Sequence, residues 1–419
     1  MLKIRGNNLL KGVIEVKGSK NSSLALMAAS ILSRGKVKLI NVPDIVDVRV
    51  MLDIFKYLNI DYIFEHNELF IDSSEIEYKS LMIDDVKKIR ASSYFMGSFL
   101  SLFNRVEIYN PGGCAFSERP IDFHINAFKE FGVIVSESDN KIKLDSSNIH
   151  NGYYYIPKVS VGTTIDILLF SSLHENMFII DNVAVESEVE EVIKFLRLLG
   201  VEILKIKERT LLVKGKKALN KDVEYNVMND RIEAGTLALL GALLGDNLTI
   251  KGFNMFDNLY LLNLFNKLKV PYTIKDNNLM ISRHIDFEGV DLETNPYPFL
   301  PTDLQPLISV FLSFGKSKSS IKENIYPSRI SHVFELQKLN FNIEFNNNKI
   351  IFNPTKKLIG NKVYGKDLRG GCALLMASLL VDDYTYFYGI NYIERGYENF
   401  LSRLKNIGAL IYEEESNFD

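Results

Sequence analysis

Cys114 stands in a glycine-rich segment, NPGGC, and Arg119 follows five residues later. A thiol on such a turn is exposed, and a neighbouring guanidinium favours the thiolate, the form that attacks electrophiles. Donation of a proton would instead need the neutral thiol, and both forms stay open at this point. Cys372 lies in the apolar run GGCALLMASLL, which is typical of a buried structural cysteine. Cys114 is therefore the candidate for chemistry, with a merely structural cysteine as the alternative.

Two other segments place polar residues where an extended stretch meets an apolar helix. Lys20 and Asn21 follow a glycine at the start of one such helix, and Ser160–Gly162 precede another. The first N–H groups of a helix lack partners and carry positive potential, so they bind phosphate or carboxylate groups readily. A solvated lysine at an ordinary polar helix start is the alternative for Lys20. Neither segment has the glycine spacing of a Walker or Rossmann motif.

Asp303 lies in the proline-rich segment NPYPFLPTDLQ, directly before an apolar helix. We expect Thr302 to cap this helix and Asp303 to lie in its first turn, where the carboxylate either acts as a general base or complements the helix dipole. Arginines also stand beside special turns, where a planar guanidinium suits carboxylates and phosphates, although each could equally form a surface ion pair. These arginines are Arg90, Arg329, Arg369 and Arg395.

Composition excludes several classes of protein. The 49 basic and 52 acidic residues give a net charge of −3, so no overall basic field would hold nucleic acid or an anionic membrane. The two cysteines and six histidines show no spacing typical of a metal site. The longest apolar stretches are too short to cross a bilayer, and the N-terminus lacks a signal-peptide core. We therefore expect a cytoplasmic protein without a metal, a nucleic-acid partner or a membrane anchor.

A short step from helix to strand recurs along the whole chain. It consists of an apolar residue, a middle residue that is usually Asn or Gly, and a second residue that is apolar, with the middle residues at 59, 132, 200, 269, 340 and 408. Five steps lead into two alternating segments around a polar turn, which is typical of a β-hairpin. Each repeat also contains a helix that is apolar almost all round and therefore buried. The pattern predicts six β-α-β-α-β-β repeats, which form either a solenoid scaffold or, more in keeping with their length, two α/β domains of three repeats.

Ten short segments extend this pattern into a family resemblance, and they occur in one order along the chain. They are GSKN (18–21), NVPDIVDV (41–48), RAS (90–92), NPGGC (110–114), RPIDFHI (119–125), VSVG (159–162), DRIE (230–233), FLPTDLQ (299–305), DLR (367–369) and ERGYE (394–398). Together they resemble the UDP-N-acetylglucosamine enolpyruvyl transferases, also called UDP-N-acetylglucosamine 1-carboxyvinyltransferases. The resemblance implies an inside-out α/β barrel of two domains, one formed by residues 1–19 and 228–419 and the other by residues 20–227.

The resemblance also implies a reaction and a set of site residues. The enolpyruvyl group of phosphoenolpyruvate would pass to the 3′-hydroxyl of UDP-N-acetylglucosamine, the first committed step of peptidoglycan synthesis, with no cofactor. Asp303 would accept the hydroxyl proton and Cys114 would protonate the methylene carbon. Lys20, Arg119 and Arg395 would surround the donor phosphate, with Arg369, Arg395 and Arg329 toward its carboxylate. The sugar nucleotide would contact Asn21, Arg90, Pro120, Ile121, Asp122, Phe123, Lys158, Val159, Ser160, Val161, Gly162 and Ile325.

Two other functions stay open beside this one. The sister enzyme acts on shikimate 3-phosphate with the same donor, and a non-catalytic paralogue would keep only the nucleotide-sugar site. The Cys114 segment and RPIDFH favour the nucleotide-sugar enzyme, because the resemblance connects both with that substrate. Ser117-Glu118 departs from the small residues usual in the family. The resemblance further implies that an epoxide phosphonate such as fosfomycin alkylates Cys114, and the sequence leaves the oligomeric state open.

Overall fold

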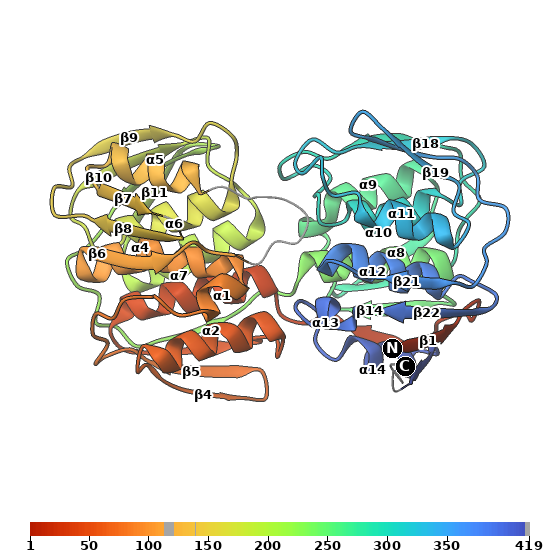
Figure 1. The fold of residues 1–419 in the computed structure, drawn as a ribbon, viewed down its shortest axis with the longest axis horizontal. Coiled ribbons are helices and arrows are strands. Elements are labelled where there is room, and N and C mark those ends of the chain that lie inside the picture. The colour runs from red at the N-terminus through yellow and green to blue at the C-terminus, as the bar shows by residue number, and fades with distance from the viewer. Residues whose placement is uncertain (113–120, 139, 415–419) are drawn as a thin grey trace. The chain divides into compact units, whose positions relative to one another are not determined.

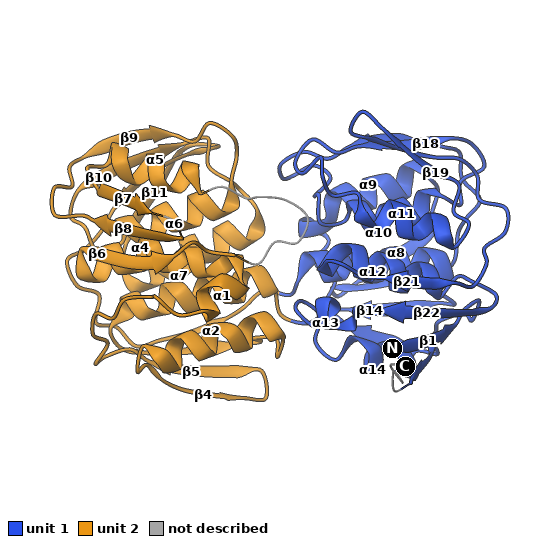
Figure 2. Cartoon of the chain, in the orientation of Figure 1, with its two compact units in different colours: residues 1–17, 115–117, 229–419 blue, residues 18–114, 118–228 orange. Residues whose placement is uncertain are grey.

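The chain forms two compact units in a computed structural model that describes residues 1–112, 121–138 and 140–414. Unit 1 contains the described residues of 1–17 and 229–419, and unit 2 contains the described residues between them (Figure 2). Each unit has its own hydrophobic core. The core of unit 2 is made by side chains between Leu24 and Val227, and that of unit 1 by residues 2–16 together with residues 232–411.

Unit 2 is built from three repeats, each with a buried helix, an amphipathic helix and a sheet. The first repeat comprises β13 (Val223–Asn226), α1 (Lys20–Ser30), β3 (Lys36–Ile40), α2 (Val46–Tyr57), β4 (Asp61–Glu65) and β5 (Glu68–Asp72). The second comprises α3 (Asp85–Lys88), η2 (Arg90–Ser93), α4 (Tyr94–Phe103), β6 (Arg105–Tyr109), α5 (Asp122–Glu130), β7 (Ile134–Ser138) and β8 (Lys141–Asp145). The third comprises β9 (Gly152–Tyr155), α6 (Val161–Ser171), β10 (Met177–Asp181), α7 (Ser187–Leu199), β11 (Glu202–Lys207) and β12 (Thr210–Lys214).

Unit 1 repeats this design with the two ends of the chain. Its first repeat comprises β2 (Val13–Glu15), α8 (Arg231–Leu244), β14 (Leu248–Lys251), α9 (Leu259–Lys267), β15 (Tyr272–Lys275) and β16 (Asn278–Ile281). The next comprises β17 (Asp291–Glu293), α10 (Gln305–Leu312), β18 (Ser319–Lys322), α11 (Ser331–Lys338), β19 (Ile343–Asn346) and β20 (Lys349–Phe352). The last comprises β21 (Lys362–Tyr364), α12 (Leu368–Ser378), β22 (Tyr384–Tyr388), α13 (Ile390–Ile393), α14 (Phe400–Asn406), β23 (Leu410–Glu413) and β1 (Leu2–Arg5).

Helices fill the interior of each unit and sheets cover its outside (Figure 1). In unit 2 the buried helix α4 packs against both α1 and α6, and in unit 1 α10 packs against both α8 and α12. The helices are enclosed because nearly every residue along them is apolar or small and buried. The six predicted repeats and the α/β fold class are thereby confirmed. Within the described residues no sheet closes on itself through hydrogen bonds, so the expected barrel consists of separate sheets around helices.

The six predicted steps share one backbone conformation. Asn59, Gly132, Gly200, Lys269, Asn340 and Gly408 all have positive φ values, between 58° and 110°. In each step the N–H of the next residue donates to the carbonyl five residues earlier, as from Val201 to Leu196. This is the Schellman motif, which satisfies the last carbonyls of a helix and turns the chain into the following strand. Asn and Gly recur at the middle position because they adopt the left-handed conformation at low cost.

The five predicted hairpins are present, and the sixth position is completed by a distant strand. In each of the five, two antiparallel strands flank a short polar turn, as in the pairing of β4 with β5. In the last repeat β1 lies between β22 and β23 and is antiparallel to both. Strands are also exchanged at the start of two repeats, where β2 pairs parallel with β14 and β13 pairs parallel with β3. The N-terminal strands therefore complete sheets whose other strands come from the second half of the chain.

Substitutions at two of the six steps should change stability in opposite directions. Gly200 has φ near 110° and open space where a Cβ would lie, so Gly200→Ala should cost about 1–2 kcal/mol through backbone strain alone. Lys269 is exposed and has φ near 59°, so Lys269→Gly should raise the free energy of unfolding by up to about 1 kcal/mol. Urea unfolding measures both changes, and equal effects at the two positions would contradict this account.

Candidate active site

Asp303 is held between two buried arginines in unit 1. Its Oδ1 lies 2.7 Å from Nη1 of Arg329, and its Oδ2 lies 3.2 Å from Nη2 of Arg369. The arginine side chains are only 3% and 6% exposed, whereas that of Asp303 is 26% exposed. Each carboxylate oxygen thus accepts a charge-assisted hydrogen bond. The arrangement holds a carboxylate in one orientation while leaving part of it open to a ligand.

The expectation for the helix after Asp303 was wrong. Helix α10 begins at Gln305, and Asp303 lies in the turn before it rather than in its first turn. Thr302 does not cap the helix. Its hydroxyl instead donates to Oε2 of Glu323 at 3.1 Å and accepts from Nη1 of Arg329 at 3.1 Å. A capping hydroxyl would accept from a helix N–H, but the oxygen of Thr302 accepts from Arg329 instead, and its proton goes to the buried carboxylate of Glu323, which needs donors.

Glu323 connects two loops that carry predicted site residues, and no pattern in the sequence pointed to this role. The residue is 1% exposed, and its Oε1 accepts from the N–H groups of Ile325 and Tyr326 at 2.9 Å each. The same oxygen accepts from the hydroxyl of Thr294 at 2.8 Å. With Thr302 on its other oxygen, this carboxylate fixes the Asp303 turn and the backbone at half-buried Ile325.

Arg369 is positioned by the start of α12. The carboxylate of Asp367 accepts from the N–H groups of Arg369 and Gly370 at 3.1 and 2.9 Å, which caps the helix. A Cβ at Gly370 would lie 2.7 Å from that carboxylate, so a side chain there would disturb the cap. The guanidinium of Arg369 then extends to Asp303 and to the hydroxyl of Tyr397. Half-buried Arg395 lies two residues before Tyr397, in the loop between α13 and α14.

Lys20 is not a solvated lysine. It is the first residue of α1, and Nζ lies 2.8 Å from Oδ2 of Asp47 in the first turn of α2. Both side chains are largely buried, at 12% and 5% exposure. The capping Ser19 accepts from the N–H of Ser22 at 3.2 Å, and half-buried Asn21 follows Lys20 in the first turn. The structure therefore excludes a solvated lysine at this position. It places a cation that is paired with a carboxylate at a helix N-terminus.

The predicted diphosphate segment forms the start of α6. The hydroxyl of Ser160 caps the helix by accepting from the N–H of Thr163 at 3.2 Å. The ring of His124 lies directly under Gly162, where a Cβ would come within 3.4 Å of it. Val159, Val161 and Gly162 are half-buried, and Lys158 is exposed. The helix start therefore presents backbone N–H groups over an imidazole ring.

His124 forms a buried pair that sequence reasoning missed. Its Nδ1 lies 2.8 Å from Oδ2 of Asp166, and Oδ1 of Asp166 accepts from the N–H of Gly97 at 2.7 Å. Burial raises the pKa of Asp166, and the hydrogen bond and charge of His124 and the charge of Arg90 oppose this shift. Arg90, the first residue of η2, therefore acts electrostatically on the same cluster. Ile121, Asp122 and Phe123 lie at the start of α5, just before His124, with Asp122 exposed.

Three predicted site residues, Cys114, Arg119 and Pro120, lie outside the described residues, and so does Ser117-Glu118. The other cysteine, Cys372, matches its predicted structural character. It is buried in α12, and burial raises the pKa of its thiol to about 12.

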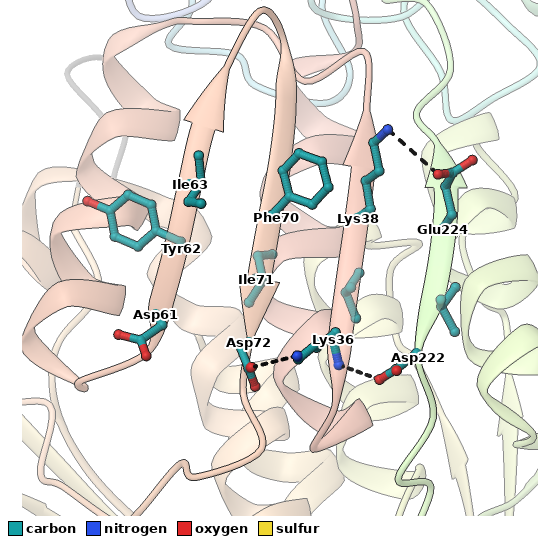
Figure 3. A pocket seen from close by; sticks show the side chains of 12 residues that line it. Lys36, Lys38, Asp61, Tyr62, Ile63, Phe70, Ile71, Asp72, Asp222 and Glu224 are labelled. Atoms are coloured by element: carbon teal, nitrogen blue, oxygen red, sulfur yellow. Dashed lines mark hydrogen bonds and ion pairs between the residues drawn. The ribbon is translucent and has the colours of Figure 1, made fainter.

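A hollow of about 660 Å³ lies elsewhere, on the outer face of the β13-β3-β5-β4 sheet (Figure 3). Exposed Ile63 and Phe70 line it, and its charged groups pair with one another: Lys38 lies 3.7 Å from Glu224, and the backbone N–H of Lys36 donates to Asp222. Its lining contains none of the predicted site residues. We therefore keep the candidate site at the helix starts described above.

The described residues contain neither a membrane-spanning helix nor a cluster of metal-binding side chains. No helix among them is both long enough and apolar enough to cross a bilayer. Among the same residues, no group of three or more His, Cys, Asp or Glu side chains is arranged to hold a metal ion.

The sequence and the fold match one family of enzymes. Residues 4–404 match the family described as EPSP synthase (3-phosphoshikimate 1-carboxyvinyltransferase), and the chain belongs to this family of enolpyruvyl transferases. It is 35% identical over 415 residues to proteins named UDP-N-acetylglucosamine 1-carboxyvinyltransferase 2 from Staphylococcus epidermidis and Staphylococcus aureus, with 99% of each chain covered.

Solved structures show the same fold. The enolpyruvyl transferase NikO from Streptomyces tendae matches with a TM-score of 0.91 at 20% identity, covering 98% of both chains. EPSP synthase from Acinetobacter baumannii matches with a TM-score of 0.75 at 13% identity, covering 98% of this chain and 99% of that one.

The Lys20–Asp47 pair separates a structural role from a functional one. Asp47→Ala should lower the free energy of unfolding by about 3 kcal/mol, because the charge of Lys20 then stays buried without this partner. Replacing both residues, as Lys20→Met with Asp47→Leu, should restore most of that loss. Thermal unfolding measures the stabilities. Full enzymatic activity in the stable double variant would show that Lys20 serves the fold alone.

His332 should make the protein sensitive to acid. Burial lowers its pKa to about 4, and Arg329 adds to this shift while Asp367 opposes it. A folded-state pKa below the unfolded value of about 6.5 gives stability that is present above pH 6.5 and is lost as pH falls toward 4. Between pH 7 and pH 5 the wild type should lose about 2 kcal/mol more than His332→Gln, measured by urea unfolding. Parallel pH curves for the two proteins would contradict the assignment.

Proposed function

We propose that this enzyme transfers the enolpyruvyl group of phosphoenolpyruvate to the 3′-hydroxyl of UDP-N-acetylglucosamine and releases phosphate. The observation that carries the proposal is the partly exposed carboxylate of Asp303, held by two buried guanidinium groups. We infer the substrates from the relatives named UDP-N-acetylglucosamine 1-carboxyvinyltransferase 2, which are 35% identical over nearly the whole chain. The reaction would serve peptidoglycan synthesis in the cytoplasm.

In the proposed first step, addition, the sugar hydroxyl oxygen forms a bond to C2 of the donor. Its proton passes to Asp303, and the methylene carbon C3 receives a proton, so that a tetrahedral ketal forms. Cys114 is the proposed donor of that second proton, a role that comes from the family resemblance. In the second step, elimination, C3 returns a proton to the Cys114 thiolate, and phosphate leaves with the electrons of its bond to C2 and takes up the proton held by Asp303, so that the double bond is restored.

The proposed binding roles follow from charge. Phosphoenolpyruvate carries up to three negative charges, so it needs several cations in fixed positions. Arg369, Arg395 and Arg329 are the proposed partners of its carboxylate, and Lys20, Arg119 and Arg395 those of its phosphate. The backbone N–H groups at Lys158–Gly162 are the proposed site of the nucleotide diphosphate, because a helix start attracts anions.

The other proposed contacts hold the sugar nucleotide. They comprise Asn21, Arg90, Pro120, Ile121, Asp122, Phe123 and Ile325. We also propose that units 1 and 2 are the two domains implied by the resemblance, with Asp303 and the donor carboxylate partners in unit 1 and the nucleotide segment in unit 2.

Phosphate release tests the substrates directly. With phosphoenolpyruvate present, we expect release with UDP-N-acetylglucosamine and none with shikimate 3-phosphate. Asp303→Asn should lower turnover by about 10²–10⁴-fold while sugar-nucleotide binding stays within about tenfold, because an amide keeps the shape but cannot take the proton. Asp286→Asn, the same change at an exposed surface aspartate, should leave activity unchanged.

Each alternative has its own outcome in this assay. Release with shikimate 3-phosphate alone would assign the sister activity. Tight binding of the sugar nucleotide without release by the wild type would indicate a non-catalytic paralogue. Near-normal turnover of Asp303→Asn would remove Asp303 from the mechanism.

A further inference from the structure

A chain of hydrogen bonds leads from Asp303 into the core of unit 1. Arg369 donates through Nη2 to Asp303 at 3.2 Å and through Nη1 to the hydroxyl of Tyr397 at 3.0 Å. The Tyr397 hydroxyl lies 2.9 Å from Oγ1 of Thr236, which in turn donates to the carbonyl of Ile232 at 2.8 Å. Tyr397 and Thr236 are each 1% exposed. The chain therefore connects the candidate base to the first turn of α8 without passing through water.

The direction of this chain follows from counting hydroxyl protons. Thr236 has one hydroxyl proton, which it gives to the carbonyl of Ile232. The Tyr397 hydroxyl must then donate to Thr236, and its own oxygen accepts from Arg369, which can only donate. Arg369 donates to Asp303 on one side, and on the other side the bonds from Arg369 through Tyr397 and Thr236 to Ile232 all point the same way, so each of these polarises the next in the same sense. The position of the Arg369 guanidinium is consequently fixed at both of its terminal nitrogens.

A neutral hydroxyl suits this position better than a second carboxylate would. Burial raises the pKa of Tyr397 well above its ordinary value, so the hydroxyl keeps its proton and remains uncharged beside Arg369. A neutral acceptor satisfies Nη1 without cancelling the positive charge. That charge stays available to Asp303 and to an anionic ligand.

Tyr397 also fixes the loop that carries a second arginine. Arg395 lies two residues earlier in the loop between α13 and α14, and the ring of Tyr397 packs against Phe400 with centroids 4.7 Å apart. The thiol of Cys372 is a further partner of the hydroxyl. One buried side chain thus links the start of α12, the start of α8 and the Arg395 loop.

We propose that Tyr397 is a positioning residue that orients Arg369, and with it the Arg395 loop, toward the carboxylate of the donor. This inference rests on the proposed function, in which both arginines bind phosphoenolpyruvate. It assigns to the ERGYE segment a second task besides supplying Arg395.

Tyr397→Phe removes only the hydroxyl and tests the proposal. Losing a hydrogen bond to a charged group should lower kcat/KM for phosphoenolpyruvate by about 10- to 100-fold, while KM for UDP-N-acetylglucosamine stays within about twofold. Tyr57→Phe is the matched control, because its hydroxyl bonds the Ser80 carbonyl in unit 2, and it should behave as the wild type. An unchanged kcat/KM for phosphoenolpyruvate in Tyr397→Phe would overturn the proposal. An equal fall in kcat/KM for phosphoenolpyruvate and for UDP-N-acetylglucosamine would also overturn it.

Two further measurements separate positioning from a general loss of stability. Thr236→Val removes the group that accepts the hydrogen bond of the Tyr397 hydroxyl. It should lower kcat/KM for phosphoenolpyruvate by a smaller factor than Tyr397→Phe does. In a variant that already carries Arg369→Lys, adding Tyr397→Phe should lower kcat/KM for phosphoenolpyruvate by less than about a further threefold. The reason is that the two residues act as one unit. Additive losses would contradict a role through Arg369.

The rise in melting temperature caused by phosphoenolpyruvate alone needs no acceptor substrate. A smaller rise in Tyr397→Phe than in the wild type would confirm the proposal even if the acceptor proved to be another molecule. An equal rise in both proteins would overturn it and leave the proposed function intact. No rise and no turnover in the wild type would refute both.

Discussion

Charge is expensive to bury, and this constraint decides where the enzyme can place its functional groups. Six helices are enclosed on nearly every side, so a charged residue along their length loses its hydration and needs buried partners, as Asp166 in α6 has in His124 and the N–H of Gly97. Their N-termini are different, because the N–H groups of the first turn have no partner within the helix and bind anionic groups. Lys20 begins α1, Ser160 caps α6 and Arg369 stands in the first turn of α12, while Asp303 precedes α10. The interior of the fold thus directs the chemistry to the helix starts.

Much of the architecture could be predicted because it depends on residue patterns that are local in the sequence. The helix-to-strand steps require a residue that tolerates positive φ, and Asn or Gly marks that position in five of the six. Alternating segments around polar turns likewise identified five hairpins. The pairing of β1 with β22 and β23 had no local signal, since the partners are separated by nearly the whole chain. The position of Asp303 was misjudged because the attraction of Thr302 to Glu323 is a tertiary contact.

The candidate site was predictable in its exposed parts and not in its supports. Arginines and a lysine beside glycine-rich or capping turns have recognisable spacing, and the structure brings Arg329 and Arg369 onto Asp303. Their supports, such as Asp47, Glu323 and the His124–Asp166 pair, look like ordinary polar residues in sequence. Burial makes them important, and burial of a single polar residue cannot be inferred from its neighbours in the chain. The roles assigned to Cys114 and Arg119 remain predictions from the resemblance.

The exchange of strands between the ends of the chain imposes an order on folding during synthesis. Unit 2 is a continuous stretch that can close once β13 has been made, because β13 supplies the last strand of its first sheet. Strands β1 and β2 are made before their partners, which lie in the second half of the chain, and β1 waits until β23. At roughly 5–20 residues per second, the interval of about 400 residues takes roughly 20–80 s. Until β22 and β23 have been made, β1 therefore has no partner strand, although unit 2 can already be complete.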